Sequence, residues 1–198
     1  MVNNYIALQE LRNYAEENNV PIMTTEGINF LTSYIQKHDI KKILEIGSAI
    51  GYSAIMMALV NEEIEITTIE RDEKRYLEAI KNIKKFKLED RINLIYNDAF
   101  NVSFTEKFDL IFIDAAKAQN IKFFEKFSHN LTPRGTIITD NMNFHGLTDK
   151  DETEIKSRNL RALVRKIKEY HTFLENNKKY DTEFLTLGDG LAISRPID

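Results

Sequence analysis

The stretch Lys42–Ser53, with the sequence KILEIGSAIGYS, decides how this chain folds. Residues 42–47 form a short apolar run with little alternation, which is typical of a parallel strand covered on both faces. Gly47 and Gly51 follow, and glycines let the backbone turn sharply and come close to a ligand. A helix that starts after the turn would present its first free N–H groups to that ligand. The stretch therefore predicts a strand, a glycine turn and a helix that together form a binding site.

A second apolar strand, 64-IEITTIE-70, indicates what kind of ligand the turn binds. Glu70 stands at its tip, where an acid can accept hydrogen bonds from ribose hydroxyl groups. The pattern Glu45-x-Gly47-x-x-x-Gly51 differs from the Gly-x-Gly-x-x-Gly pattern that binds the pyrophosphate of nicotinamide cofactors. An acid just before the turn suits a positively charged or amine-bearing ligand better, and S-adenosylmethionine carries both an amine and a sulfonium. A turn without a ligand and a nicotinamide dehydrogenase are the alternatives.

The length and composition of the chain limit its function classes. Its 198 residues predict a single domain over residues 1–198, in which residues 1–38 form a helical N-terminal extension. The net charge of −4 gives no general preference for nucleic acid, although a local basic patch could still bind it. The chain has no cysteine, which excludes disulfides, thiolate metal sites and methylation of a pyrimidine ring carbon through a cysteine adduct.

No targeting or membrane segment is expected. The N-terminal residues MVNNYIALQE lack the basic segment and apolar core of a signal peptide. The longest apolar run, Ala54–Val60, is far too short to span a bilayer. We therefore expect a soluble cytoplasmic protein without a membrane partner.

Hydrophobic periodicity and turn residues predict an alternation of strands and helices. The predicted helices cover residues 4–17, 25–37, 51–61, 72–86, 118–130 and 151–176. The predicted strands cover residues 42–47, 64–70, 92–96, 109–114, 136–140, 180–187 and 190–195, with a turn at 133–135. Gly188-Asp189-Gly190 indicates a hairpin between the last two strands. The order predicts an α/β fold with a mostly parallel seven-stranded sheet, an antiparallel C-terminal hairpin and helices on both faces.

Polar residues end several of these strands, and right-handed crossovers place the strand ends at one edge of the sheet. Asp114 and Asp140 each end a strongly apolar strand, and Asn141 follows directly. Three oxygen ligands without histidine or cysteine suit a hard cation such as Mg²⁺. The alternative is that the two acids only cap the helices that follow them.

Lys117 lies three residues after Asp114, a spacing that can return its ammonium group to the same place. Close to a divalent cation and a sulfonium, a lysine releases its proton more readily and can serve as a general base. The alternative is an exposed lysine in the first turn of a helix.

The predicted C-terminal helix has a basic flank. Four basic residues recur on it at a spacing of three or four residues: Arg158, Arg161, Arg165 and Lys168. Such a stripe can follow an RNA backbone, although an ordinary solvated helix face has the same composition. Phe144 and His145, shortly after Asn141, could stack on an RNA base or serve as packing residues.

Five segments, in this order, resemble one family. KILEIGSAIGYS, TTIERD, IYNDA, DLIFIDAAKAQ and ITDN are similar to the metal-dependent class I O-methyltransferases of the catechol and caffeoyl-coenzyme A type. The resemblance covers nearly the whole chain, including PIMTTEG at 21–27 and RNLR at 158–161. The combination of Asp-x-x-Lys with a later Asp-Asn is specific to the metal-dependent group. Within it, the chain is most similar to the short bacterial members that methylate 5-hydroxyuridine in tRNA.

The resemblance implies a Rossmann-like class I methyltransferase fold and a set of functional residues. It implies that Glu70 binds the ribose and that the segment Asp98-Ala99 contacts the adenine. The implied S-adenosylmethionine site comprises Met23, Glu45, Gly47, Ser53, Glu70, Asp98, Ala99 and Asp114. The implied ligands of Mg²⁺, or of another divalent cation, are Asp114, Asp140 and Asn141, with Lys117 as the base.

The resemblance also implies a substrate. Members that act on coenzyme A esters carry extra N-terminal and insertion segments, and this chain is short there. The expected reaction converts 5-hydroxyuridine to 5-methoxyuridine at the tRNA wobble position, since the 5-hydroxyl and 4-carbonyl groups offer the two neighbouring oxygens that a metal can chelate. A small catechol-like phenol offers the same pair and is the first alternative. A non-catalytic RNA- or protein-binding module is the second. We expect the tRNA anticodon loop and a second copy of the chain, in a homodimer, as partners.

Overall fold

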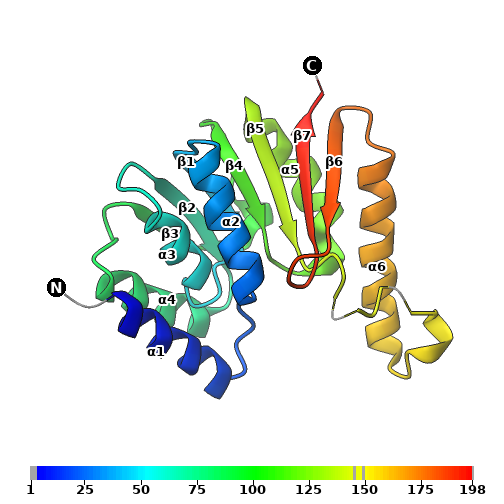
Figure 1. The fold of residues 1–198 in the computed structure, drawn as a ribbon, viewed down its shortest axis with the longest axis horizontal. Helices are drawn as coiled ribbons and strands as arrows, with labels where there is room; N and C mark the ends of the chain where they lie inside the picture. Colours follow the sequence, from blue (N-terminus) through cyan, green and yellow to red (C-terminus); the bar gives the residue numbers. More distant parts are fainter. Residues whose placement is uncertain (1–3, 145, 149, 198) are drawn as a thin grey trace.

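A single seven-stranded sheet forms the centre of the computed structural model, which describes residues 4–144, 146–148 and 150–197 (Figure 1). The strands are β1 (Lys42–Ile46), β2 (Glu65–Glu70), β3 (Ile92–Tyr96), β4 (Phe108–Ile113), β5 (Leu131–Asp140), β6 (Tyr180–Leu185) and β7 (Leu191–Pro196). Their order in the sheet is β3-β2-β1-β4-β5-β7-β6. The first five strands pair in parallel, and β7 is antiparallel to both of its neighbours. The predicted sheet is therefore confirmed.

Helices cover both faces of the sheet, as expected (Figure 1). The α-helices are α1 (Asn4–Glu17), α2 (Thr25–Lys37), α3 (Tyr52–Ala58), α4 (Glu73–Lys85), α5 (Asn120–Phe127) and α6 (Arg158–Glu175). Short 3₁₀ turns are η1 (Ala99–Asn101), η2 (Lys117–Gln119), η3 (Ser128–Asn130) and η4 (Glu152–Glu154). Helices α1 to α4 contribute to one hydrophobic cluster against the sheet, and α5 and α6 contribute to another. Among the residues described, no helix has the length and apolar character needed to cross a membrane.

Polar side chains set where the helices begin. The hydroxyl oxygen of Thr24 accepts a hydrogen bond from the Gly27 N–H at 3.1 Å, and Asp72 accepts one from the Arg75 N–H at 3.0 Å. Such caps satisfy backbone donors that the first helical turn leaves unpaired. Helices α2 and α4 thus begin as predicted. The prediction for α6 was wrong, because the helix begins at Arg158 with Ser157 as its cap rather than at 151.

A second correction concerns residues 133–135. The sequence predicts a turn there, but these residues lie within β5 as a bulge. Phe108 pairs with Leu131, and Leu110 pairs with Thr136. Between these pairs, the single residue Asp109 on β4 lies opposite four residues of β5. A bulge accepts Pro133 inside a strand, because the extra residues need no ladder hydrogen bond. Most other ends of predicted elements shift by at most three residues.

The glycine turn after β1 holds the strand ends together. Gly47 has a φ of +98°, in the left-handed region, and a Cβ there would lie 2.5 Å from the backbone oxygen of Asp114. Only glycine fits such an approach. The Asp114 N–H donates to the Ile46 carbonyl at 3.0 Å, so the end of β4 is bound to the end of β1. The turn therefore fixes Asp114 at the edge where a ligand binds.

Helix α6 is anchored to the sheet by a buried pair of hydroxyl groups. Tyr170 is fully buried, and its hydroxyl group shares a hydrogen bond of 2.8 Å with that of Thr139 on β5. We expect Tyr170→Phe to lower the free energy of unfolding by about 1–2 kcal/mol, because the Thr139 hydroxyl loses its partner in a dry site. Urea denaturation with an unchanged m-value would measure the loss.

The matched control is Tyr96→Phe at the exposed edge strand β3, which should change the free energy of unfolding by less than about 0.5 kcal/mol. Adding Thr139→Val to Tyr170→Phe removes the unpaired hydroxyl. The double variant should therefore lose less than the sum of the two single variants, and strict additivity would contradict the assigned contact.

Candidate active site

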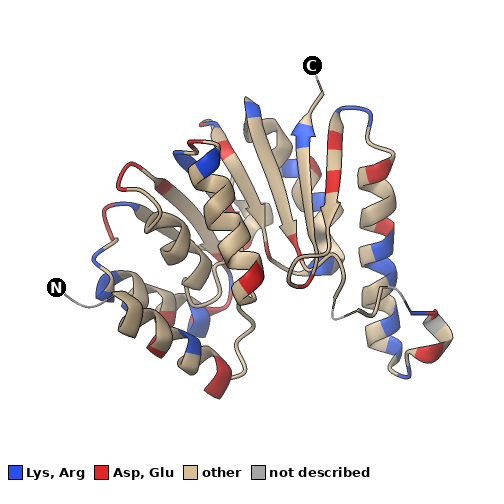
Figure 2. Ribbon diagram, viewed as in Figure 1, with Lys and Arg blue, Asp and Glu red and all other residues tan. Residues whose placement is uncertain are grey.

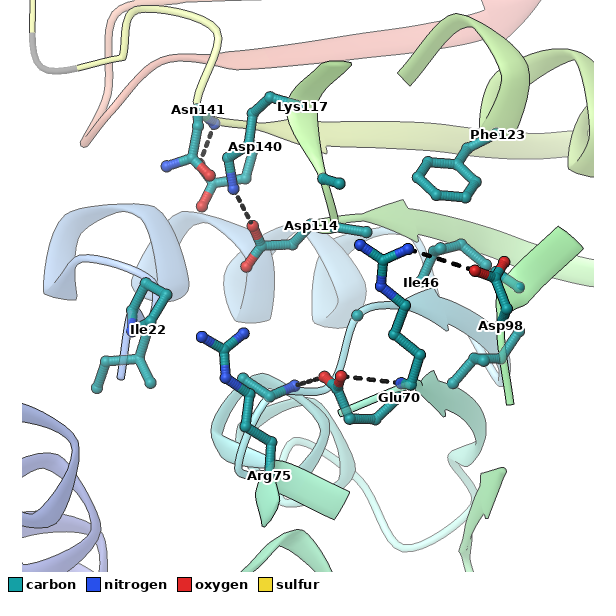
Figure 3. A pocket seen from close by; sticks show the side chains of 18 of the residues that line it. Ile22, Ile46, Glu70, Arg75, Asp98, Asp114, Lys117, Phe123, Asp140 and Asn141 are labelled. Atoms are coloured by element: carbon teal, nitrogen blue, oxygen red, sulfur yellow. Dashed lines mark hydrogen bonds and ion pairs between the residues drawn. The ribbon is translucent and has the colours of Figure 1, made fainter. Parts of the chain in front are cut away.

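A cavity of about 440 Å³ opens at the carboxyl ends of β1, β2, β4 and β5 (Figure 3). This is the edge at which open α/β sheets bind ligands. Its walls come from strand ends, from the turns that follow them and from Pro21, Ile22 and Thr24 before and at the cap of α2. The cavity brings together predicted residues that lie far apart in the sequence, from Gly47 to Asn141.

One end of the cavity is apolar. Ile46, Ile69, Ala99 and Phe123 line it, and Figure 3 shows Phe123 near Asp98 at the end away from Asn141. Asp98 accepts hydrogen bonds from Arg71 at 3.3 Å and from the Phe100 N–H at 2.9 Å. An apolar slot with an acid at its rim is suited to a flat, nitrogen-rich ring.

Glu70 lies midway along the cavity, and its carboxylate joins two turns. One oxygen accepts a hydrogen bond from the Ala49 N–H at 2.8 Å. The other accepts from the N–H groups of Arg71 and Asp72 at 2.9 and 2.8 Å. An ionised carboxylate has about four acceptor positions, so one stays open to a hydroxyl group of a ligand. Ala49 has a φ of +46°, so it adopts the left-handed backbone that glycine adopts in related turns.

Three residues of the predicted cofactor site do not line the cavity: Met23, Glu45 and Ser53. Glu45 lies beneath the glycine turn with no exposed surface, and it accepts hydrogen bonds of 2.5 Å from Ser53 and from Thr68. Burial raises the pKa of Glu45 to about 7 in spite of these two hydrogen bonds. In this structure Glu45 connects β1 to β2 and α3.

The other end of the cavity is acidic. The Lys117 ammonium group lies 3.1 Å from the Asp114 carboxylate, as the three-residue spacing predicts. Asp140 is buried, and its carboxylate accepts a hydrogen bond from the Asn141 N–H at 2.8 Å. Figure 3 shows Asp114, Lys117, Asp140 and Asn141 gathered at this end. The structure therefore brings together the four residues that the sequence selects for chemistry.

Burial and crowding raise the pKa values of two carboxylates at this end. Burial raises the pKa of Asp140 to about 7, and repulsion from Asp114 adds to the shift. Burial also raises the pKa of Asp114, although Lys117 acts in the opposite direction. A bound cation would stabilise the ionised form of both carboxylates.

Asp189 is a third carboxylate at this end, and our sequence analysis missed it. It lines the cavity from the hairpin between β6 and β7 and accepts a hydrogen bond of 2.9 Å from the Asn141 side-chain amide. Because β6 runs parallel to β5, that hairpin must lie at the same sheet edge. The predicted topology could therefore have indicated that Asp189 lies near Asp114 and Asp140. Ile22 and Arg75 also line the cavity without having been predicted.

The donor atoms fit a hard divalent cation. No three Asp, Glu, His or Cys side chains within the described part of the chain converge closely enough to hold a metal alone. The predicted ligands, however, are two carboxylates and one amide. The side-chain N–H of Asn141 donates a hydrogen bond to the Asp189 carboxylate, and the amide oxygen of Asn141 has no partner among the residues described. Asn141 also has a φ of +64°, and such strained backbone clusters at functional sites.

The predicted RNA-binding residues lie outside this cavity. They lie along α6, where Figure 2 shows a run of basic residues: Arg158, Arg161, Arg165 and Lys168. Lys168 donates to the backbone oxygen of Lys150 at 3.2 Å. Phe144 lines the cavity. His145 lies outside the described residues.

Comparisons with known proteins bear on the family and the fold of the chain. The O-methyltransferase family model matches residues 2–197. A caffeoyl-CoA O-methyltransferase of Populus kitakamiensis is 27% identical over 201 residues, which cover 95% of this chain and 85% of that protein. A Staphylococcus aureus protein, named as a candidate caffeoyl-CoA O-methyltransferase, has a crystal structure with a TM-score of 0.91 at 39% identity, covering 96% of this chain and 92% of that one. The crystal structure of the SAH-bound methyltransferase PaMTH1 of Podospora anserina has a TM-score of 0.87 at 25% identity. The match covers 97% of this chain and 88% of that one.

The raised pKa of Glu45 predicts a dependence of stability on pH. Folding moves this pKa from 4.5 to about 7, so the folded state holds the proton more tightly than the unfolded chain. Its contribution to the free energy of unfolding is complete below about pH 4.5 and is lost as the pH rises to about 7. We expect Glu45→Gln to reduce the fall in stability between pH 5 and 7 by about 2 kcal/mol.

Denaturation of the wild type and the variant across this pH range would measure the difference. The Ser53 and Thr68 hydroxyl groups can accept as well as donate, so glutamine keeps both contacts. Glu65→Gln, at an exposed position on β2, is the control and should leave the pH dependence unchanged. The same pH dependence in Glu45→Gln and the wild type would contradict the assignment.

Proposed function

Because the chain belongs to the O-methyltransferase family and is an S-adenosylmethionine-dependent enzyme, we propose that its acceptor is 5-hydroxyuridine at the tRNA wobble position. The product is 5-methoxyuridine. The observation that carries the proposal is the acidic end of the cavity, where Lys117 lies 3.1 Å from Asp114 and next to Asp140 and Asn141. This arrangement suits deprotonation of a hydroxyl group that has an oxygen neighbour.

In this proposal S-adenosylmethionine lies along the cavity in one orientation, with its adenine at the apolar end. The apolar end, with Ala99 and Phe123, accepts the adenine ring beside Asp98. Glu70 accepts a ribose hydroxyl at its remaining acceptor position. The sulfonium would then lie towards the acidic end, where Asp114 would stabilise its positive charge.

Asp114, Asp140 and Asn141 would hold Mg²⁺ or another divalent cation. Such an ion lowers the pKa of a hydroxyl group that binds to it. Asp189 positions Asn141 through its amide nitrogen, which leaves the amide oxygen for the ion. Lys117 would first release its own proton, which a nearby divalent cation and sulfonium favour. As a neutral amine it would then take the proton of the substrate hydroxyl and become an ammonium beside the Asp114 carboxylate. The oxygen of the substrate, held in line with the sulfonium, would then take the methyl group, and S-adenosylhomocysteine would leave as the carbon–sulfur bond breaks.

One feature favours a polynucleotide acceptor. The basic flank of α6 lies outside the cavity, where it can meet the phosphates of a polymer rather than a small phenol. A catechol-like phenol is the second candidate, because it shares the two neighbouring oxygens and because one relative, from Vitis vinifera, is named a flavonoid 3',5'-methyltransferase.

One experiment tests the acceptor. The purified protein is incubated with S-adenosylmethionine labelled in its methyl group, Mg²⁺ and tRNA that carries 5-hydroxyuridine, with catechol in a parallel reaction. Both reactions are repeated with a chelator. Label in the tRNA that disappears on chelation would support the proposal, whereas label only in catechol would replace tRNA by a small phenol.

Removing the base should stop the chemistry but leave the cofactor site intact. We expect Lys117→Ala to lower kcat for tRNA methylation by about 100- to 10,000-fold, the usual contribution of a positioned general base. The affinity for S-adenosylmethionine, measured by calorimetry, should change by less than about twofold, because Glu70 and the glycine turn remain.

The matched control is Lys122→Ala, an exposed lysine on α5, which should keep the wild-type kcat. A Lys117→Ala enzyme with full kcat would exclude Lys117 as the base. An equal loss in both variants would exclude it too, because the loss would then be a general effect of charge.

A further inference from the structure

A second cavity, of about 430 Å³, lies between α6 and the ends of β6 and β7 that meet the hairpin. Its volume lies within the range of ordinary small-molecule sites. Met142, Ile167 and Leu191 line it and are buried, so its floor is apolar. Asn143 and Lys168 are among the polar residues of its wall.

One wall of this cavity is an aromatic pair. The His171 ring lies flat on Phe184, with ring centroids 3.8 Å apart and an angle of 14° between the planes. The His171 side chain is nevertheless 40% exposed. Phe184 covers one face of the imidazole, and the Glu175 carboxylate lies 3.4 Å from its Nδ1 atom, so the exposed surface belongs to the other face and the rest of the edge. A flat ring entering the cavity can therefore stack on His171.

The two cavities share the segment that follows β5. Asn141 and Phe144 line the first cavity, whereas Met142 and Asn143 line the second. This shared wall is bound to the hairpin, since the Met142 N–H donates to the Gly190 carbonyl at 3.0 Å and the Asn143 N–H to the Asp189 carbonyl at 2.8 Å. A Cβ at Gly190 would lie 2.6 Å from the backbone nitrogen of Asn143, so the hairpin packs tightly against this segment. Two sites thus stand on either side of one fixed segment.

The charges of the two cavities differ in sign. Asp114, Asp140 and Asp189 line the first, but no acidic residue is among the described residues that line the second. Lys168 lines the second cavity, and Arg165 and Arg161 continue the basic flank along α6. A phosphate backbone that leaves the first cavity would therefore meet positive charge beside the second.

We propose that the second cavity binds the base of a nucleotide next to the one that is methylated. The inference rests on the proposed RNA substrate. A loop nucleotide drawn into the first cavity leaves its neighbour unstacked, and unstacked bases are commonly held on aromatic side chains. His171 supplies the stacking face, and the Asn143 amide nitrogen, which has no hydrogen-bond partner among the described residues, supplies a donor for the edge of the base. The flanking phosphates lie along the basic flank of α6.

The test uses an anticodon stem-loop RNA with 5-hydroxyuridine at the wobble position. In two versions, 2-aminopurine replaces the base on one side or the other of that position, because its fluorescence falls when it stacks. We expect the wild-type protein to quench one of the two versions. In His171→Ala, that quenching should disappear and the RNA should bind about 5- to 100-fold more weakly, as expected for the loss of one stacked base.

Two variants make the test specific. His171→Phe keeps a flat ring and should retain both the quenching and the affinity. His129→Ala, an exposed histidine in η3, should behave like the wild type. The affinity of all three variants for S-adenosylmethionine should match the wild type, which separates a local effect from misfolding.

The outcomes separate this inference from the proposed function. RNA binding with quenching that depends on His171, but without methyl transfer, would keep the second site and remove the proposed reaction. Methyl transfer to tRNA without quenching of either version would overturn the second site and keep the reaction. RNA that does not bind at all would overturn both.

Discussion

The crowding of carboxylates at one edge of the sheet is the constraint on which the site depends. Parallel strands bring Asp114 and Asp140 to the same edge, and the hairpin brings Asp189 to meet them. Burying like charges is unfavourable unless a partner of opposite charge is present. Lys117 favours the ionised form of Asp114, but burial raises the pKa values of both Asp114 and Asp140. A positively charged ligand at this edge would stabilise the ionised carboxylates.

The sequence predicted the framework of this site because its signals are local. An apolar run, a glycine turn and an acid at a strand end each depend on few neighbouring residues. Parallel topology then brings the strand ends together, so the sequence alone predicts that Asp114, Lys117, Asp140 and Asn141 lie at one edge of the sheet. The Asp114–Lys117 contact follows from a three-residue spacing alone.

The features that were missed depend on tertiary contacts. Glu45 was predicted to line the cofactor site, yet its carboxylate is held by Thr68 from a neighbouring strand and does not reach the cavity. Helix α6 begins at Arg158 because of one capping serine within a polar stretch. The bulge in β5 depends on how β4 pairs with it, which no local pattern shows. The role of Asp189 required the direction of β6 to be known first.

Binding of a divalent cation tests the central claim most directly. We would titrate Mn²⁺ into the metal-free protein, with S-adenosylmethionine present, and follow free Mn²⁺ by electron paramagnetic resonance. We expect one ion to bind per chain in the wild type, to be displaced by Mg²⁺, and to be lost in Asp140→Ala. If the wild type binds no ion, or if Asp140→Ala binds it equally well, the acidic end of the cavity is not a metal site.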